Sequence, residues 1–150
     1  MMKYICKPFF LLFIVVSVFL AGCQTVNLIS DYDEETDKSV SALQKKVDTF
    51  FQMYESDPAT IGGNYEQHIS FYDEVQVDIN SILFWVNAAP KNEISSELVT
   101  ELDKIIDKFE ELHQARLVDP EGLAEARKSV LNVFTNILTL ELAKKKKESD

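Results

Sequence analysis

Apolar side chains recur every three or four residues in four successive segments that together cover most of residues 33–147. That spacing is the period of one buried face of an α-helix, and no segment alternates apolar and polar residues convincingly enough to be a strand. The helices are expected at about 33–56, 64–87, 92–117 and 120–147. Because short turns connect them, the pattern predicts an all-α fold, an antiparallel up-and-down four-helix bundle.

The expected helix boundaries carry residues that cap or interrupt helices. Asp57 precedes a proline, and a residue in that position is pushed away from helical backbone. Asn64 and Asn92 are placed to cap the second and third helices, the former with Gln67 as the partner of a capping box. Asp119, followed by a proline and an acid, marks the start of the fourth helix. The connection at 56–63, rich in proline and glycine, is expected to be irregular.

Each helix has an expected inward face at this spacing. In the first two helices it comprises Val40, Leu43, Val47, Phe50 or Phe51, Tyr54, and then Tyr65, His68, Tyr72, Val75, Ile79, Ile82 and Val86. In the last two it comprises Ile94, Leu98, Leu102, Ile105, Phe109, Leu112, and then Leu123, Ala126, Val130, Val133, Ile137 and Leu140. The lysines at 144–147 close the last helix, where cations complement the helix dipole. They are expected to be solvated, or alternatively to contact a membrane surface.

The residues before the bundle have the layout of a secretory signal peptide. Lys3 and Lys7 precede an apolar run that begins at Phe9 and ends in small residues. From Phe9 to Gly22 the run has 14 residues, and a membrane-spanning helix needs roughly 20. A cleaved signal is therefore favoured over an uncleaved membrane anchor.

The four residues Leu20-Ala21-Gly22-Cys23 indicate which kind of signal this is. They resemble the lipobox of bacterial lipoproteins, which is cut before the cysteine. The resemblance implies a signal peptide at 1–22 and a lipidated N-terminus at Cys23. The pattern of the following residues then predicts a tether within 23–32 and a bundle domain at 33–150. Cys23 would then carry acyl chains such as palmitate, and more than one chain makes a stable anchor. The alternative is an unmodified cysteine in an ordinary signal peptide.

The residue after the lipobox cysteine bears on localisation. In the lipoproteins that this signal resembles, an aspartate there commonly favours retention in the inner membrane. Gln24 occupies the position here. The resemblance therefore implies the periplasmic face of the outer membrane, with the inner membrane less favoured.

Cysteine and charge content exclude several classes of function. Cys6 and Cys23 are the only cysteines, so the processed chain would keep no free thiol for a disulfide, a zinc cluster or catalysis. Removing residues 1–22 takes away Lys3 and Lys7 and no acid, which changes the formal charge from −10 to −12. A nucleic-acid partner is not expected, because such proteins neutralise phosphates with basic residues. The acidic surface either attracts a cationic partner or simply keeps the chain soluble.

Three residues are weak candidates for a metal site. Glu110 and His113 are three apart, the spacing used by ferritin-like di-iron bundles, but those proteins need two such pairs and two further glutamates. The other histidine, His68, has Tyr65 three residues before it, so a second pair is missing. No metal or other cofactor is predicted. His113 is expected beside the inward face in a structural or surface role, and His68 near a bundle end, hydrogen-bonded or pH-sensitive.

Motifs for catalysis are not found. Glu74 and Asp78 lie four apart and could form an acid–base pair, but no nucleophile is spaced to work with them, so a solvated face is the preferred interpretation. The sequence contains no glycine-rich phosphate loop, serine elbow or His-Glu-x-x-His motif. A non-enzymatic protein is therefore expected.

Phe84 and Trp85 are candidates for a partner-binding site. As neighbours on a helix they cannot both point the same way, so one of them is expected either to form an exposed apolar patch or to pack between helices. Together these features predict a membrane-anchored periplasmic lipoprotein that binds an envelope protein or supports an envelope assembly. The alternative is a bundle that binds a metal or a small ligand.

Overall fold

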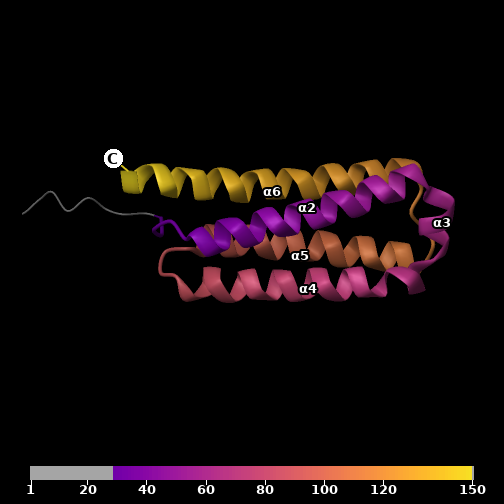
Figure 1. Ribbon diagram of the computed structural model, residues 1–150, viewed down its shortest axis with the longest axis horizontal. Coiled ribbons are helices and arrows are strands. Elements are labelled where there is room, and N and C mark those ends of the chain that lie inside the picture. The colour runs from indigo at the N-terminus through magenta and orange to yellow at the C-terminus, as the bar shows by residue number, and fades with distance from the viewer. Residues whose placement is uncertain (1–28, 150) are drawn as a thin grey trace, which may run out of the picture.

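The computed structural model describes residues 29–149 (Figure 1). The predicted signal peptide, the lipobox-like residues and Gln24 lie outside the described residues. Within them the chain forms four long helices and one short one, and no strand: α2 (Glu34–Ser56), α3 (Pro58–Gly63), α4 (Tyr65–Ala88), α5 (Glu93–Gln114) and α6 (Pro120–Ser149). None of these helices has an apolar stretch long enough to cross a bilayer.

The four long helices run alternately up and down, as predicted (Figure 1). Each packs against two others: α2 and α5 both lie between α4 and α6. One end of the bundle, called here the residue-30 end, brings together residues 29–33, the α4–α5 turn and the C-terminal end of α6. The opposite end carries α3, which crosses from α2 to α4.

The predicted cap at Asp119 is confirmed, and Asp33, at the expected start of the first helix, is a further cap. The carboxylate of Asp33 accepts hydrogen bonds from the backbone N–H groups of Glu35 and Thr36, at the start of α2. Asp119 Oδ1 accepts from Gly122 N at 2.7 Å, at the start of α6. Both helices therefore begin where an acidic residue satisfies free N–H groups.

The side-chain caps predicted at Asn64 and Asn92 are wrong. Both residues occupy the position before a helix, but neither side chain bonds to the first turn. Asn64 contributes only its backbone carbonyl, which accepts from Gln67 N at 3.0 Å. Asn92 is buried, and its side chain is engaged in a polar network described below.

The connection expected to be irregular contains a helix instead. Asp57 ends α2 as predicted, but Pro58 then serves as the first residue of α3, where its missing N–H costs nothing. Gly62 lies so close to α2 that a Cβ there would be 2.6 Å from Tyr54 Oη. A larger residue at this position would therefore displace the side chain of Tyr54 or move α3 away from α2.

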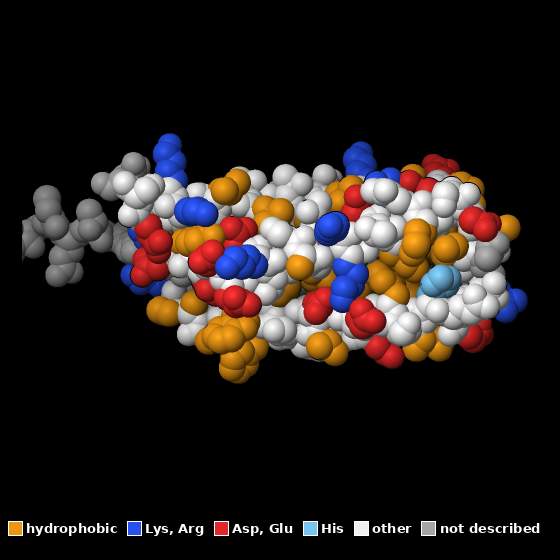
Figure 2. Space-filling view, viewed as in Figure 1, with side chains coloured by type: hydrophobic (Ala, Val, Ile, Leu, Met, Phe, Trp, Pro, Cys, Tyr) orange, Lys and Arg blue, Asp and Glu red, His pale blue; other side chains and the backbone are white. Residues whose placement is uncertain are grey.

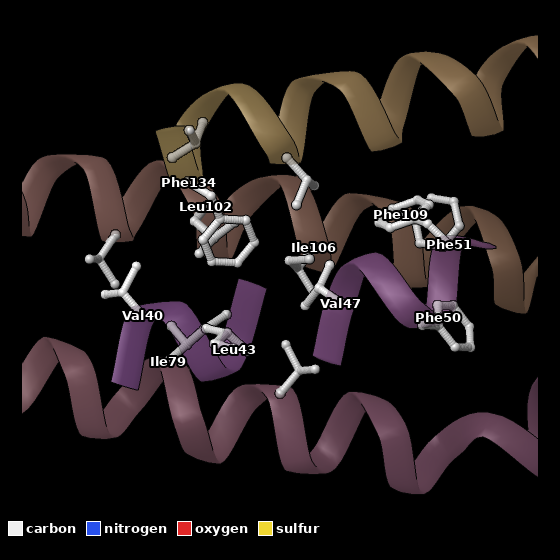
Figure 3. Close-up of a cluster of buried hydrophobic side chains, with 14 of the residues drawn as sticks. Val40, Leu43, Val47, Phe50, Phe51, Ile79, Leu102, Ile106, Phe109 and Phe134 are labelled. Atoms are coloured by element: carbon white, nitrogen blue, oxygen red, sulfur yellow. The ribbon is translucent and has the colours of Figure 1, made fainter. Parts of the chain in front are cut away.

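The core runs along the axis of the bundle, where the inward faces of the long helices meet (Figure 3). The faces predicted for α2 and α4 are largely confirmed: Val40, Leu43, Val47, Phe50, Phe51, Tyr54, Tyr72, Val75, Ile79, Ile82 and Val86 are buried. Both Phe50 and Phe51 belong to the core, while Tyr65 is half-buried and packs against it. His68 is half-buried.

The inward face predicted for α5 is confirmed at Leu102 and Phe109, and the predicted Leu98 and Ile105 are half-buried against the core, but the other fully buried positions lie one residue further along. Its buried residues are Ser95, Val99, Leu102, Ile106, Phe109 and His113. Ile94, expected inside, is 54% exposed. The observed face begins and ends with a polar residue, and both are buried because they find hydrogen-bond partners. A prediction from apolar residues alone therefore favoured the neighbouring face of the helix, because it left out the two buried polar residues.

The last two turns of α6 also differ from the prediction. Instead of Leu140, the inward positions after Ile137 are Glu141 and Lys144. The prediction of a solvated lysine run is therefore wrong for Lys144, which is 2% exposed, while the three lysines after it are exposed. Two charged side chains inside the bundle need compensating partners.

Candidate functional site

A buried polar network fills the residue-30 end of the bundle. It is called here the Lys144 network and comprises Ser30, Asn92, Ser95, Glu141 and Lys144. Lys144 Nζ donates to Glu141 Oε1 at 2.6 Å, Asn92 Oδ1 at 2.7 Å and Ser95 Oγ at 2.9 Å. All three donors of the ammonium group are used. These contacts explain how a lysine can be buried here.

The network is anchored in several elements. Glu141 and Lys144 come from α6 and Ser95 from the first turn of α5. Asn92, in the α4–α5 turn, also donates from Nδ2 to the carbonyl of Val86 in α4 at 3.1 Å. The network therefore ties the turn to α6 and closes this end of the bundle.

One atom of the network has no partner. Glu141 Oε2 is buried and accepts no hydrogen bond, although Oε1 accepts from Lys144 and Ser95. An unsatisfied buried carboxylate oxygen is costly. The ion pair with Lys144 is what makes the burial of Glu141 tolerable.

The chain segment just before α2 is docked on this network. Ser30 is buried, its N–H donates to Lys91 O at 2.9 Å, and its hydroxyl donates to Asn92 Oδ1 at 2.9 Å. Tyr32 N donates to Glu148 Oε1 at 2.8 Å. The end of the predicted tether is thus part of the folded unit.

The aromatic patch, Phe84 and Trp85, lies on the surface of α4 near the residue-30 end. Phe84 is 67% exposed and Trp85 is 46% exposed, and the two rings meet edge to face with centroids 5.5 Å apart. Figure 2 shows hydrophobic side chains gathered on the surface at that end of α4. Both residues are accessible to a partner.

A shallow pocket adjoins the aromatic patch. It measures about 490 Å³ and lies between residues 29–33, Trp85 and the α4–α5 turn. One wall is therefore the docked segment itself. The patch and the Lys144 network are structurally connected through this segment.

The predicted metal candidates lie at the opposite end of the bundle, where His113 is fully buried. Its Nε2 is 2.8 Å from Ile61 O in α3, and its Nδ1 is 2.7 Å from Tyr72 Oη in α4. Because a carbonyl only accepts, Nε2 carries the proton and Nδ1 accepts from the tyrosine. Both ring nitrogens are thus committed to structural bonds, so His113 has a structural role and is not free to bind a metal.

The other two candidates do not complete a metal site with His113. Glu110 Oε1 accepts from Tyr65 Oη at 2.6 Å, a bond that raises the pKa of Tyr65 to about 12. His68 contacts the ring of His113, with centroids 5.9 Å apart. Among the described residues, no group of three or more potential ligands is placed to hold a metal ion.

The acidic residues Glu74 and Asp78 bind a lysine of the neighbouring helix. Lys46 Nζ in α2 donates to both carboxylates, at 3.2 Å and 2.8 Å. Both acids are substantially exposed, as expected for a solvated face. The geometry is that of a surface ion-pair cluster joining α2 to α4.

A groove of about 640 Å³ runs between α5 and α6 on the surface of the bundle. Its floor is apolar and includes Ile105, Phe109 and Val133, and its rims carry charged and amide side chains. The groove does not touch the Lys144 network, the aromatic patch or His113.

Comparison with known proteins identifies no relative. No protein-family model matches the sequence, and neither curated proteins nor solved structures gave a match.

His113 makes the stability of the bundle depend on pH. Its pKa is lowered mainly by burial and also by nearby His68, although the bond to Ile61 and the charge of Glu110 oppose this. The unfolded chain therefore binds a proton first, near pH 6.5. The contribution of His113 to the free energy of unfolding is fully present above that pH and is lost as the pH falls toward its folded-state pKa. It amounts to about 1.4 kcal/mol for each unit by which folding lowers that pKa.

Urea unfolding measured from pH 8 to pH 4 tests this prediction. A His113→Gln variant is the control, because its side chain does not titrate while the carboxylates still do. We expect the wild-type protein to lose more stability than the variant below pH 6.5. If the free energy of unfolding depends on pH in the same way in both proteins, His113 does not contribute to the pH dependence.

Proposed function

We propose that this protein is a non-enzymatic lipoprotein, anchored through Cys23 at the periplasmic face of the outer membrane, that binds an envelope protein partner through the aromatic patch. The observation that carries the proposal is the exposure of Phe84 and Trp85 side by side on an otherwise well-packed bundle. Exposed aromatic residues in a cluster are typical of binding surfaces, and tryptophan is enriched among the residues that dominate binding energy.

The hydrogen bonds and ion pairs made by the polar side chains support a binding role over a catalytic one. Two buried polar side chains are used in structural contacts: His113 is bonded at both nitrogens, and Lys144 at all three donors. The acidic pair Glu74 and Asp78 is bound to Lys46. These groups are therefore poorly placed to transfer protons to a substrate.

Affinity purification from detergent-solubilised envelopes tests the binding role. We expect the full-length protein to recover one stoichiometric partner, and Trp85→Ala to bind it roughly 30-fold more weakly, as removing a residue worth 2 kcal/mol would. Leu117→Ala is the matched control, because Leu117 is a large apolar residue that is also exposed, at 68%, but lies at the opposite end of the bundle. Equal recovery by wild type and Trp85→Ala would exclude the patch as the binding site.

The α5–α6 groove favours a second candidate function, the binding of a small apolar ligand. Its volume of about 640 Å³ is within the range of small-molecule sites, and its floor is apolar. Native mass spectrometry of protein purified from cells, together with metal analysis, separates the candidates. A stoichiometric ligand or metal would favour this second function over the first.

A further inference from the structure

The segment from Ile29 to Asp33 is fixed to the bundle by contacts with three separate elements. Ser30 binds the α4–α5 turn through both its backbone N–H and its hydroxyl. Tyr32 binds α6 through its N–H, and the ammonium group of Lys145 lies 5.0 Å from the centre of its ring. Tyr32 Oη also donates to Asp37 in α2 at 2.8 Å. These contacts position the segment independently of the residues before it.

The socket for Ser30 is built from buried groups. Asn92 Oδ1 accepts simultaneously from the hydroxyl of Ser30 and the ammonium group of Lys144. Asn92 is itself fixed by its bond to Val86 O. Because Lys144 is in turn fixed by Glu141, the charged pair orients the amide that receives the docked segment.

The length of chain before Ser30 limits how far this end can lie from a lipid on Cys23. Seven residue steps separate the two positions, and they span at most about 25 Å when fully extended. Helix α6, with 30 residues, is about 45 Å long. The residue-30 end is therefore held near the membrane, whereas the α3 end can extend well away from it.

We infer that the Lys144 network docks the end of the tether onto the bundle, which keeps the aromatic patch near the bilayer surface and selects a partner that is itself embedded in that membrane. The inference rests on the proposed lipidation of Cys23. It deepens the proposed function by assigning the class of partner: an integral membrane protein with an apolar surface close to the bilayer.

A protein is favoured over the lipid itself by the position and surroundings of the patch. Phe84 lies four residues before the end of α4, about 6 Å from the tip of the helix, so it faces sideways from the bundle. The charges beside the adjoining pocket are mixed, because Asp31 and Asp33 line it together with Lys91. Lys147 also pairs with Asp31, at 3.3 Å. These opposite charges offset one another, so they give no net attraction to anionic lipid headgroups.

Energy transfer from Trp85, the single tryptophan of the chain, measures the position of the patch. The lipidated full-length protein is reconstituted into phosphatidylethanolamine and phosphatidylglycerol vesicles that contain a dansyl-labelled headgroup lipid. Wild type is expected to show strong transfer. A Ser30→Pro/Tyr32→Ala double variant removes both hydrogen bonds of Ser30 and the ring and hydroxyl contacts of Tyr32. It leaves in place the bond from the residue-32 N–H to Glu148 and the pair of Asp31 with Lys147. At least twofold less transfer is expected.

Two further variants test whether the energy transfer reports the distance of the bundle from the bilayer. Ser56→Ala, at an exposed serine far from the network, should leave the transfer unchanged. Inserting about twenty Gly and Ser residues after Gln24 should reduce transfer even with the docking contacts intact, because a longer flexible tether lets the bundle move away. Equal transfer in wild type and the double variant would overturn the inference.

Two other outcomes can be distinguished from equal energy transfer in wild type and the double variant. If the protein does not float with the vesicles, lipidation fails, and amide hydrogen exchange on the full chain tests docking directly: slow exchange at Ser30 supports it and fast exchange overturns it. If reconstitution with lipid alone shifts the emission of Trp85 to the blue, the patch contacts the bilayer. That result would overturn the assignment of a protein partner.

Discussion

Replacing Lys144 with methionine is expected to destabilise the bundle by about 3–5 kcal/mol, the range found when one partner of a buried ion pair is removed. The substitution leaves the buried carboxylate of Glu141 with only Ser95 as a hydrogen-bond donor, and it removes a donor from Asn92. Methionine fills a similar volume, so loss of packing contributes little. The measurement is urea unfolding at pH 7.

A double variant and a neighbouring control isolate the cause. In Glu141→Leu/Lys144→Met both charges are gone, and stability should return to within about 1 kcal/mol of wild type or exceed it, since replacing a buried pair by apolar residues is often neutral or stabilising. Lys145→Met changes an exposed lysine one residue along and should alter stability by at most about 0.5 kcal/mol. Similar effects of Lys144→Met and Lys145→Met would contradict the burial of the ion pair.

Replacing Phe50 with alanine should be as costly, about 3–5 kcal/mol. Phe50 lies in the core between the helices (Figure 3), and its ring is at the centre of an aromatic cluster. It stacks on Phe71 with centroids 3.9 Å apart and contacts the edges or faces of five other rings, Phe51, Tyr54, His68, Tyr72 and His113. Removing it leaves a cavity that the surrounding rings cannot fill without losing their own contacts.

The matched control is Phe84→Ala, which deletes the same side chain from an exposed position. Its expected effect on the midpoint of urea unfolding is small, because the ring of Phe84 remains largely in water in the folded state. The two variants thus separate the structural aromatic residues from the proposed binding residues. A loss of stability from Phe84→Ala comparable to that from Phe50→Ala would show that the patch is part of the core.

The fold could be predicted because apolar periodicity is strong where the core is purely apolar. In α2 the predicted face and the observed face agree from Val40 to Tyr54. The starts of α2 and α6 could be predicted as well, because Asp33 and Asp119 cap them through local bonds. Such signals depend only on residues close together in the sequence.

The Lys144 network could not be predicted in the same way, because its members are buried only through one another. Ser95 and Glu141 are 46 residues apart and Asn92 and Lys144 are 52 apart. A signal was nevertheless present: Glu141 and Lys144 continue the spacing of Val133 and Ile137 along α6. Polar residues that extend an apolar stripe deserve consideration as core residues.

His113 was misplaced for a related reason. The apolar residues of the third segment favour a face that ends at Leu112, whereas the observed face ends at His113. The partners that make this burial possible are Ile61 O, in a segment expected to be irregular, and Tyr72 Oη. The unexpected helix α3 thus accounts for two errors, the prediction of an irregular connection at 56–63 and the placement of His113 beside the inward face. For Phe84 and Trp85 the sequence predicted an exposed patch from one of them, with packing between helices as the alternative, whereas both are exposed.

The lipid anchor at Cys23 can be tested by the intact mass of the protein purified from bacterial membranes, with peptide mapping of its N-terminus. We expect a chain that begins at Cys23 and carries a thioether-linked diacylglyceryl group and an N-acyl chain, and we expect a Cys23→Ser variant to lack this modification. A mature chain that begins at any other residue, or an unmodified Cys23, would contradict the lipid anchor and with it the proposed site of action.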